Sequence, residues 1–159
     1  MPPYYSARIL GNVAEPHVVV AFARRRHAFS FVTRATRAGG RWSHTALFDP
    51  VREVFHEALM FAGVVETPAS EWFGHYSEAR LIAVPCPRPA DGWAFAHAQT
   101  GKGYDYWGAA GVPWRRPWQD PDRWYCSEKD AAVLAAAGRP LFRDAEFGVH
   151  PHDLYRVAM

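Results

Sequence analysis

The chain has 159 residues and a net charge of +2, with 49% hydrophobic and 21% charged residues. This balance predicts one globular domain over residues 1–159, without internal repeats or low-complexity linkers. The net charge is too small to indicate nucleic-acid binding, and the sequence lacks the run of about 18 apolar residues that a membrane span needs.

The N-terminal half reads mainly as strands. A β-branched apolar run over residues 18–23 predicts a buried strand, and a short helix is predicted over residues 29–38. Two strand-like runs, residues 43–48 and 51–60, are separated by the turn dipeptide Asp49-Pro50, which predicts a hairpin. Residues 79–84 predict a further strand that ends at a proline cluster.

The C-terminal half mixes helices with irregular chain. Asp91 is a candidate N-cap for a helix over residues 92–100, and residues 104–124 have the composition of a loop. A second helix is predicted over residues 126–137, because Glu128 lies in its first turn and Gly138 follows it. A last strand-like piece covers residues 153–157. The predicted class is α+β, with an antiparallel sheet packed against helices.

Two cysteines, Cys86 and Cys126, are too few for a disulfide framework, so a reducing compartment is the default. The N-terminus does not read as a signal peptide, so a cytoplasmic location is expected, with export by another route left open. Adjacent His56 and Glu57 on a strand would point to opposite faces, and two further histidines, His150 and His152, do not complete a ligand set. No metal and no cofactor are therefore expected.

Cys126 is the most informative position. It opens a predicted helix, where the partial positive charge and free N–H groups lower the pKa of a thiol and can bind an oxyanion. A buried cysteine that acts as a small hydrophobic residue is an equally weighted alternative from this position alone. Cys86 lies between two prolines with no helix after it, so a structural role is favoured there.

A nucleophilic cysteine needs a base, and His44 lies on the first strand of the predicted hairpin. If the Asp49-Pro50 turn is symmetric, His44 faces Glu57, which could hold one ring nitrogen while the other faces the thiol. A slip of one residue would bring His56 there instead. For each of these residues a plain alternative exists: a half-buried hydrogen-bonded histidine, and an exposed strand glutamate paired with an arginine such as Arg52.

From about residue 28 onward, the chain resembles a permuted papain-like cysteine hydrolase of the YiiX-like branch of the NlpC cell-wall peptidase superfamily. In that branch the histidine strand precedes the cysteine helix. The matching segments are Arg41-Trp42-Ser43-His44-Thr45-Ala46, Val54-Phe55-His56-Glu57-Ala58, Gly103-Tyr104-Asp105-Tyr106, Trp124-Tyr125-Cys126-Ser127-Glu128 and His150-Pro151-His152-Asp153-Leu154. The chain departs from the family pattern at Lys129, where an aliphatic residue is common.

The resemblance implies thiol-dependent cleavage or acyl transfer at an amide or ester bond, in peptidoglycan peptides or in acylated peptides or lipids. Cys126 would be the nucleophile, His44 the base and Glu57 the orienting acid, with Asp105 as the alternative to Glu57. Tyr104, Tyr125 and Trp124 are the expected substrate-binding residues.

A second function fits the same sequence. The domain could be a catalytically idle binding module that recognises a cell-wall or lipid ligand through its Trp- and Arg-rich stretch, residues 107–124. The sequence does not specify the substrate, the oligomeric state or a bacterial or phage origin.

Overall fold

The computed structural model describes residues 9–11, 13–24, 40–111, 120, 122–142 and 148–159. The helix predicted over residues 29–38 lies outside these ranges. The elements, in chain order, are β1 (Ile9–Leu10), β2 (His17–Arg24), β3 (His44–Asp49), β4 (Val54–Leu59), β5 (Gly63–Pro68), α2 (Ala69–Trp72), η2 (Phe73–His75), β6 (Glu78–Pro85), α3 (Pro89–Ala98), β7 (Gly103–Tyr104), α4 (Tyr106–Gly111), β8 (Arg123–Trp124), α5 (Cys126–Ala136) and α6 (Pro151–Ala158).

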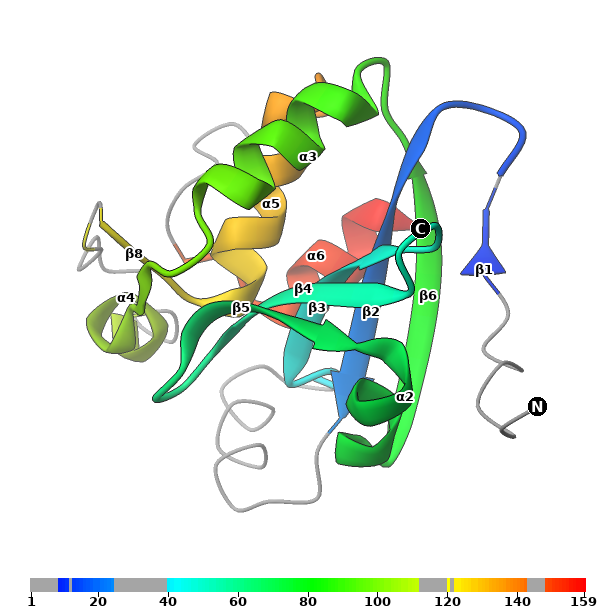
Figure 1. The fold of residues 1–159 in the computed structure, drawn as a ribbon. Helices are drawn as coiled ribbons and strands as arrows, with labels where there is room; N and C mark the ends of the chain where they lie inside the picture. The colour runs from blue at the N-terminus through cyan, green and yellow to red at the C-terminus, as the bar shows by residue number, and fades with distance from the viewer. Residues whose placement is uncertain (1–8, 12, 25–39, 112–119, 121, 143–147) are drawn as a thin grey trace.

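A six-stranded sheet in the order β1-β6-β2-β3-β4-β5 forms the centre of the molecule (Figure 1). Its strands pair antiparallel except for β1, which runs parallel to β6. Two short strands, β7 and β8, pair in parallel away from this sheet. The α+β class with a mostly antiparallel sheet and helices is confirmed.

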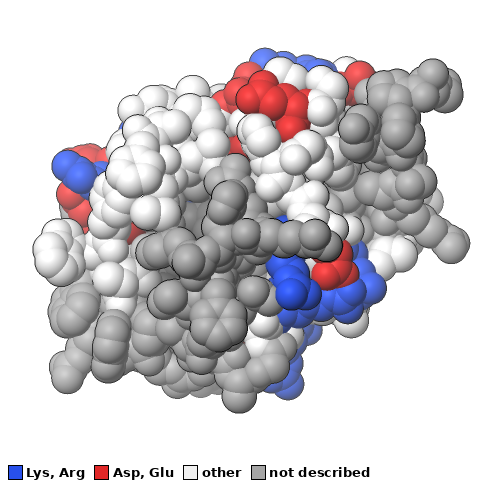
Figure 2. All heavy atoms as spheres, turned by 90° about the horizontal axis from the view of Figure 1, so that it is seen from below, with Lys and Arg blue, Asp and Glu red and all other residues white. Residues whose placement is uncertain are grey.

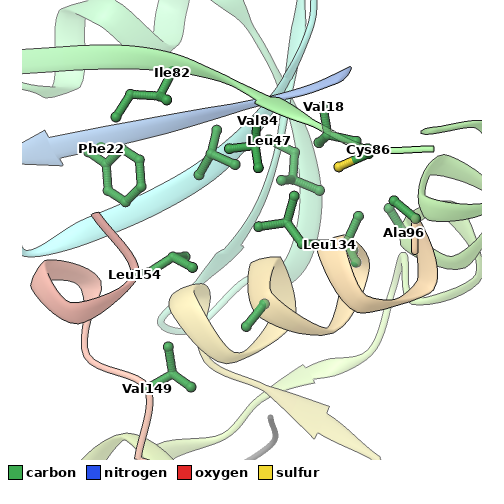
Figure 3. Close-up of a cluster of buried hydrophobic side chains, with 14 of the residues drawn as sticks. Val18, Phe22, Leu47, Ile82, Val84, Cys86, Ala96, Leu134, Val149 and Leu154 are labelled. Atoms are coloured by element: carbon green, nitrogen blue, oxygen red, sulfur yellow. The ribbon is translucent and has the colours of Figure 1, made fainter. Parts of the chain in front are cut away.

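Strand β2 is buried on both faces, which explains its uninterrupted apolar sequence. Its even-numbered side chains, including Val18 and Phe22, point towards α5 and α6 and contact Leu134 and Leu154 in one core (Figure 3). Its odd-numbered side chains join a second core that contains Phe55 and Trp72 on the opposite face. The sheet therefore separates two apolar layers.

Several elements differ from the sequence-based prediction. The predicted strand at residues 153–157 is part of helix α6, which Pro151 begins in the position where proline favours a helix start. The predicted loop at 104–124 contains α4 and the short strands β7 and β8. Strand β5 was not predicted, and helix α3 begins at Pro89, so Asp91 lies in its first turn rather than at the N-cap.

Charged side chains form separate groups on the surface. Figure 2 shows Lys and Arg atoms gathered around an acidic side chain, with other acidic atoms grouped elsewhere on the same face. Ion pairs on the surface include Arg41 with Glu78, and Arg52 with Glu66 at 2.6 Å. In the part of the chain that the structure describes, no helix has the length and apolar character needed to cross a membrane.

Candidate active site

Cys126 is the first residue of α5, as predicted. The preceding residue, Tyr125, has an extended backbone, and its N–H donates to Glu128 Oε2 at 3.4 Å. The acidic Glu128 in the first turn favours a helix that starts at this point. The thiol of Cys126 therefore lies at the positive end of a helix. Because Cys126 is only 6% exposed, the thiol is nearly enclosed by protein.

His44 is the first residue of β3 and its side chain is 12% exposed. Its ring stacks on Tyr76 with the ring centroids 5.4 Å apart and an angle of 7° between the planes. Nε2 lies 2.7 Å from Glu57 Oε2. Because Nε2 is used in this way, Nδ1 is the ring nitrogen left for the thiol.

The carboxylate of Glu57 is buried and receives hydrogen bonds from four side chains. Besides His44, the donors are Thr67 Oγ1 to Oε1 at 2.6 Å, and Trp72 Nε1 and Tyr76 OH to Oε2 at 3.0 and 3.2 Å. Four donors compensate the burial of one negative charge. Glu57 is thus fixed in place, and the predicted alternative of a surface pair with Arg52 is wrong, because Arg52 binds Glu66.

The hairpin register differs from the prediction by two residues. β3 and β4 pair Leu47 with His56 and Phe48 with Phe55. Continued by one residue, this register places Ala46 opposite Glu57. Residues 50–53 occupy a wider turn than the symmetric Asp49-Pro50 turn that was assumed. A shift of two residues leaves every side chain on its original face. His44 and Glu57 therefore still meet, diagonally rather than directly opposed.

The Cys126 thiol and the His44 imidazole are close enough for each to change the protonation of the other. Burial opposes both charges, but the hydrogen bonds to Cys126 and Glu57 raise the pKa of His44 to about 10. Burial is the largest single effect on Cys126 and raises its pKa, but the hydrogen bond and the charge of His44, with the backbone of Thr45, together lower the pKa below the usual value. Both directions favour a thiolate–imidazolium pair at neutral pH.

Glu57 stays ionised beside this pair. Burial acts to raise its pKa, whereas the bonds from His44, Thr67 and Trp72 lower it to about 2. A permanent carboxylate next to Nε2 keeps the proton on that nitrogen and stabilises a positive imidazole. The three side chains that the sequence nominated as Cys126, His44 and Glu57 are therefore brought together.

The other nominated residues differ in position. Tyr104 is near the thiol: burial and the charge of Cys126 raise its pKa well above the usual value, so its hydroxyl keeps its proton. Tyr125 instead accepts a hydrogen bond from Val149 N at 3.1 Å, and Trp124 donates to Gln99 Oε1 at 3.1 Å. The polar groups of Tyr125 and Trp124 thus bond within the protein, and substrate binding by these two residues stays a prediction.

Asp105, the predicted alternative to Glu57, is buried elsewhere. Its Oδ1 accepts the N–H of Gly108 at 2.7 Å and its Oδ2 accepts the N–H of Asp120 at 3.0 Å. The carboxylate thus caps the start of α4 and ties it to the chain before β8. The expectation that Asp105 could orient His44 is wrong.

Comparison with solved structures shows which fold this is. The structure of YiiX, a metalloprotein from Escherichia coli O157:H7, matches with a TM-score of 0.57 over 80% of this chain and 69% of YiiX. The chain has a YiiX-like fold. Sequence identity to YiiX is 21%, so the likeness concerns the fold alone. No family model and no curated protein matches the sequence.

Within the YiiX-like fold, three members of the site were missed by sequence reasoning: Thr67, Trp72 and Tyr76. They come from β5, α2 and the segment after η2, all of which follow the hairpin directly. A pattern of polar atoms at otherwise apolar positions was the available signal. Thr67 and Trp72 are buried, and a buried hydroxyl or indole N–H needs a partner.

Cys86, His150 and His152 lie outside the site. Cys86 is in the core below α5, where burial raises the pKa of its thiol, and both cysteines are free. His150 and His152 lie at the start of α6, where His150 caps the helix by accepting the His152 N–H at 3.0 Å. Over the described residues, no three or more His, Cys, Asp or Glu side chains are grouped to hold a metal ion.

Proposed function

We propose that the protein is a thiol-dependent hydrolase or acyl transferase on a permuted papain-like scaffold. The observation that supports this best is the contact chain from Cys126 at a helix start, through His44 on a strand, to the buried Glu57. A nucleophile, a base and an orienting acid in hydrogen-bond contact are the parts that acyl transfer needs. The order of histidine before cysteine is that of the permuted family.

In the proposed reaction, the Cys126 thiolate attacks the carbonyl carbon of an ester or amide, and a C–S bond forms. The imidazolium of His44 then gives its proton to the leaving oxygen or nitrogen as the old bond breaks. Water, activated by the neutral imidazole, cleaves the thioester and returns the thiol. During both steps the Cys126 N–H at the helix start, with the protonated Tyr104 hydroxyl, would bind the oxyanion.

The substrate classes implied by the resemblance are peptidoglycan peptides and acylated peptides or lipids. Exposed aromatic side chains continue from Tyr104: its ring lies 5.0 Å from Tyr106, which is 6.1 Å from Phe61. Phe61 is 92% and Trp107 72% exposed, which suits a wall for an apolar substrate. The same surface would serve the alternative function, an idle binding module, although residues 112–119 of that stretch are not described.

YiiX is described as a metalloprotein, but the residues of this site do not fit a metal centre. Both oxygens of Glu57 already accept hydrogen bonds, and one of the His44 ring nitrogens is engaged by Glu57. A ligand role would require these bonds to break. The proposed reaction therefore uses groups of the chain itself and water.

Alkylation with iodoacetamide tests the proposal without a known substrate. We expect Cys126 to react with a pH midpoint below about 8.5, the value of a free thiol, because His44 stabilises its thiolate. Mass spectrometry of the digested protein identifies which cysteine carries the label at each pH. Cys86 is the internal control: it lies in the apolar core and burial raises the pKa of its thiol, so it should react only after unfolding.

Acylation by p-nitrophenyl acetate separates the enzyme from the binding module. The enzyme should release p-nitrophenolate in a burst and carry one acetyl group on Cys126. A reactive thiol that never becomes acylated would favour the binding module, and an unreactive thiol would eliminate the proposed mechanism. Peptidoglycan fragments and acylated peptides can then be compared as substrates of an acylation-competent protein.

A Glu57→Gln variant should lower the acylation rate by about 10²- to 10⁴-fold, by analogy with triad mutants. All four contacts of Glu57 are donors, so the amide NH₂ of glutamine would face at least one of them. His44 would lose both its fixed tautomer and the charge that supports its proton. Stopped-flow acylation by p-nitrophenyl acetate measures the effect.

Acid unfolding of the same variant gives an independent check. The pKa of Glu57 is about 2 in the folded protein and 4.5 ordinarily, so its stabilisation is complete above pH 4.5 and is lost as the pH falls towards 2. The wild type should therefore lose stability over this range more steeply than Glu57→Gln. Glu66→Gln is the matched control, since its pair with Arg52 lies at the surface and is screened by solvent. Equal acylation rates in the Glu57 and Glu66 variants would remove Glu57 from the site.

A further inference from the structure

A second buried polar group lies behind the nucleophile. The side chain of Lys129 is fully buried, and its Nζ is 2.9 Å from the backbone oxygen of His56 and 3.1 Å from His56 Nδ1. His56 is also fully buried, and its Nε2 lies 3.1 Å from Thr100 Oγ1. The group therefore links helix α5 to strand β4 and to the end of α3.

The protonation of this group follows from its surroundings. Burial, then Lys129 and the nearby His97, lower the pKa of His56 to about 3, so its ring is neutral. Lys129 donates to Nδ1, which leaves the ring proton on Nε2 to be donated to Thr100. Both hydrogen bonds consequently have one fixed direction.

The buried lysine is costly for the fold. A buried ion pair is seldom more stable than apolar side chains of the same volume, and its best-attested use is to specify one arrangement. Asp130 Oδ1 is 2.7 Å from Lys129 Nζ, but among the described residues neither oxygen of Asp130 accepts an aligned hydrogen bond. Its contact with Lys129 is thus mainly coulombic, and within the described part of the chain the two aligned bonds of Lys129 go to His56.

The link between Lys129 and His56 shares strand β4 and helix α5 with the active site. His56 and Glu57 are neighbours on β4 and point to opposite faces of the sheet. Glu57 holds the base His44 on one face. On the other face, His56 holds Lys129, which follows Cys126 by three residues on α5, less than one helical turn. One strand therefore fixes both the base and the helix that carries the nucleophile.

We propose that Lys129 and His56 are positioning residues, which set the first turn of α5 so that the Cys126 thiol meets His44. This proposal rests on the proposed function, since it assigns the pair a role in the thiol–imidazole contact. Neither residue touches the reacting atoms. Their loss should weaken the thiolate–imidazolium pair in molecules that are still folded.

The experiment compares the pH midpoint of Cys126 alkylation by iodoacetamide in the wild type and four variants. Lys129→Met and His56→Leu should raise the midpoint by about one pH unit, which slows labelling about tenfold at any pH below both midpoints. His56→Asn should stay near the wild type, because its Oδ1 can replace Nδ1 as an acceptor. Thr100→Val, at an exposed position, should show a smaller rise.

The His56 variants distinguish positioning from charge, since His56 is neutral and its replacement leaves Lys129 and Asp130 in place. Circular dichroism and urea unfolding establish which variants are folded. A folded His56→Leu, or Thr100→Val if the former does not fold, with the wild-type midpoint would overturn the proposal. An ordinary midpoint in the wild type would instead refute the proposed function, so the two failures are distinguishable.

Discussion

Cys126→Ala is expected to abolish the acylation burst with p-nitrophenyl acetate, a loss of at least about 10³-fold, and to leave the protein folded. Removal of the nucleophile leaves no atom to form the thioester, as with other triad nucleophiles. The substitution removes one sulfur at a helix start, and the turn keeps its bond from Tyr125 N to Glu128. Burst kinetics and intact-protein mass spectrometry report the loss, and circular dichroism reports the fold.

Cys86→Ala is the matched control for this prediction. Cys86 is packed in the core beside Val18 and Val84, so its truncation should cost stability by about 1 kcal/mol and leave acylation unchanged. The two cysteine variants thus separate loss of a nucleophile from loss of packing. Acylation that persists in Cys126→Ala, or that disappears in Cys86→Ala, would contradict the assignment of the nucleophile.

His44→Gln is expected to lower acylation by about 10³- to 10⁴-fold, at the upper end of what a positioned acid–base group supplies. Without the imidazolium, burial becomes the dominant effect on Cys126 and raises the pKa of its thiol. The pH profile should change as well. In the wild type the rate should fall as the pH rises through about 10, where His44 loses its proton, and the variant should lack this limb.

Stability provides a second readout of His44. Its folded pKa, about 10, is above the ordinary 6.5, so the stabilisation from its charge is complete below pH 6.5 and lost as the pH rises through 10. Urea unfolding at neutral and alkaline pH should show this loss in the wild type and not in the variant. The double variant His44→Gln/Glu57→Gln controls for a buried carboxylate left without its partner. Wild-type acylation by the His44→Gln variant would show that His44 is not the base.

Local sequence was sufficient for the elements that carry the site. The apolar runs at residues 18–23 and 81–84 lie in β2 and β6, because strand segments buried on both faces need no alternation. The helix that starts at Cys126 is encoded by Glu128 in its first turn, and its end is encoded by Gly138. His44 and Glu57 share a face despite the wrong register, because the side-chain period of a strand is two.

Other features depended on contacts between distant segments. The amphipathic stretch at residues 153–157 is helical because Leu154 reaches the core beside Phe22, and a short apolar pattern does not by itself separate strand from helix. Asp105 and Tyr125 matched the family segments, yet their polar groups are engaged by backbone N–H groups of Gly108 and Val149. Only the folded chain shows which polar groups are already occupied.

The sequence by itself determined which residue types could act: a cysteine at a helix start, a histidine on a strand and a glutamate on the same face. The tertiary structure decided their chemistry. The donors Thr67, Trp72 and Tyr76 converge on Glu57, and Lys129 reaches His56 across 73 residues of chain. Protonation depends on burial and on every neighbouring donor and charge, and these are fixed only when the sheet and helix α5 pack together.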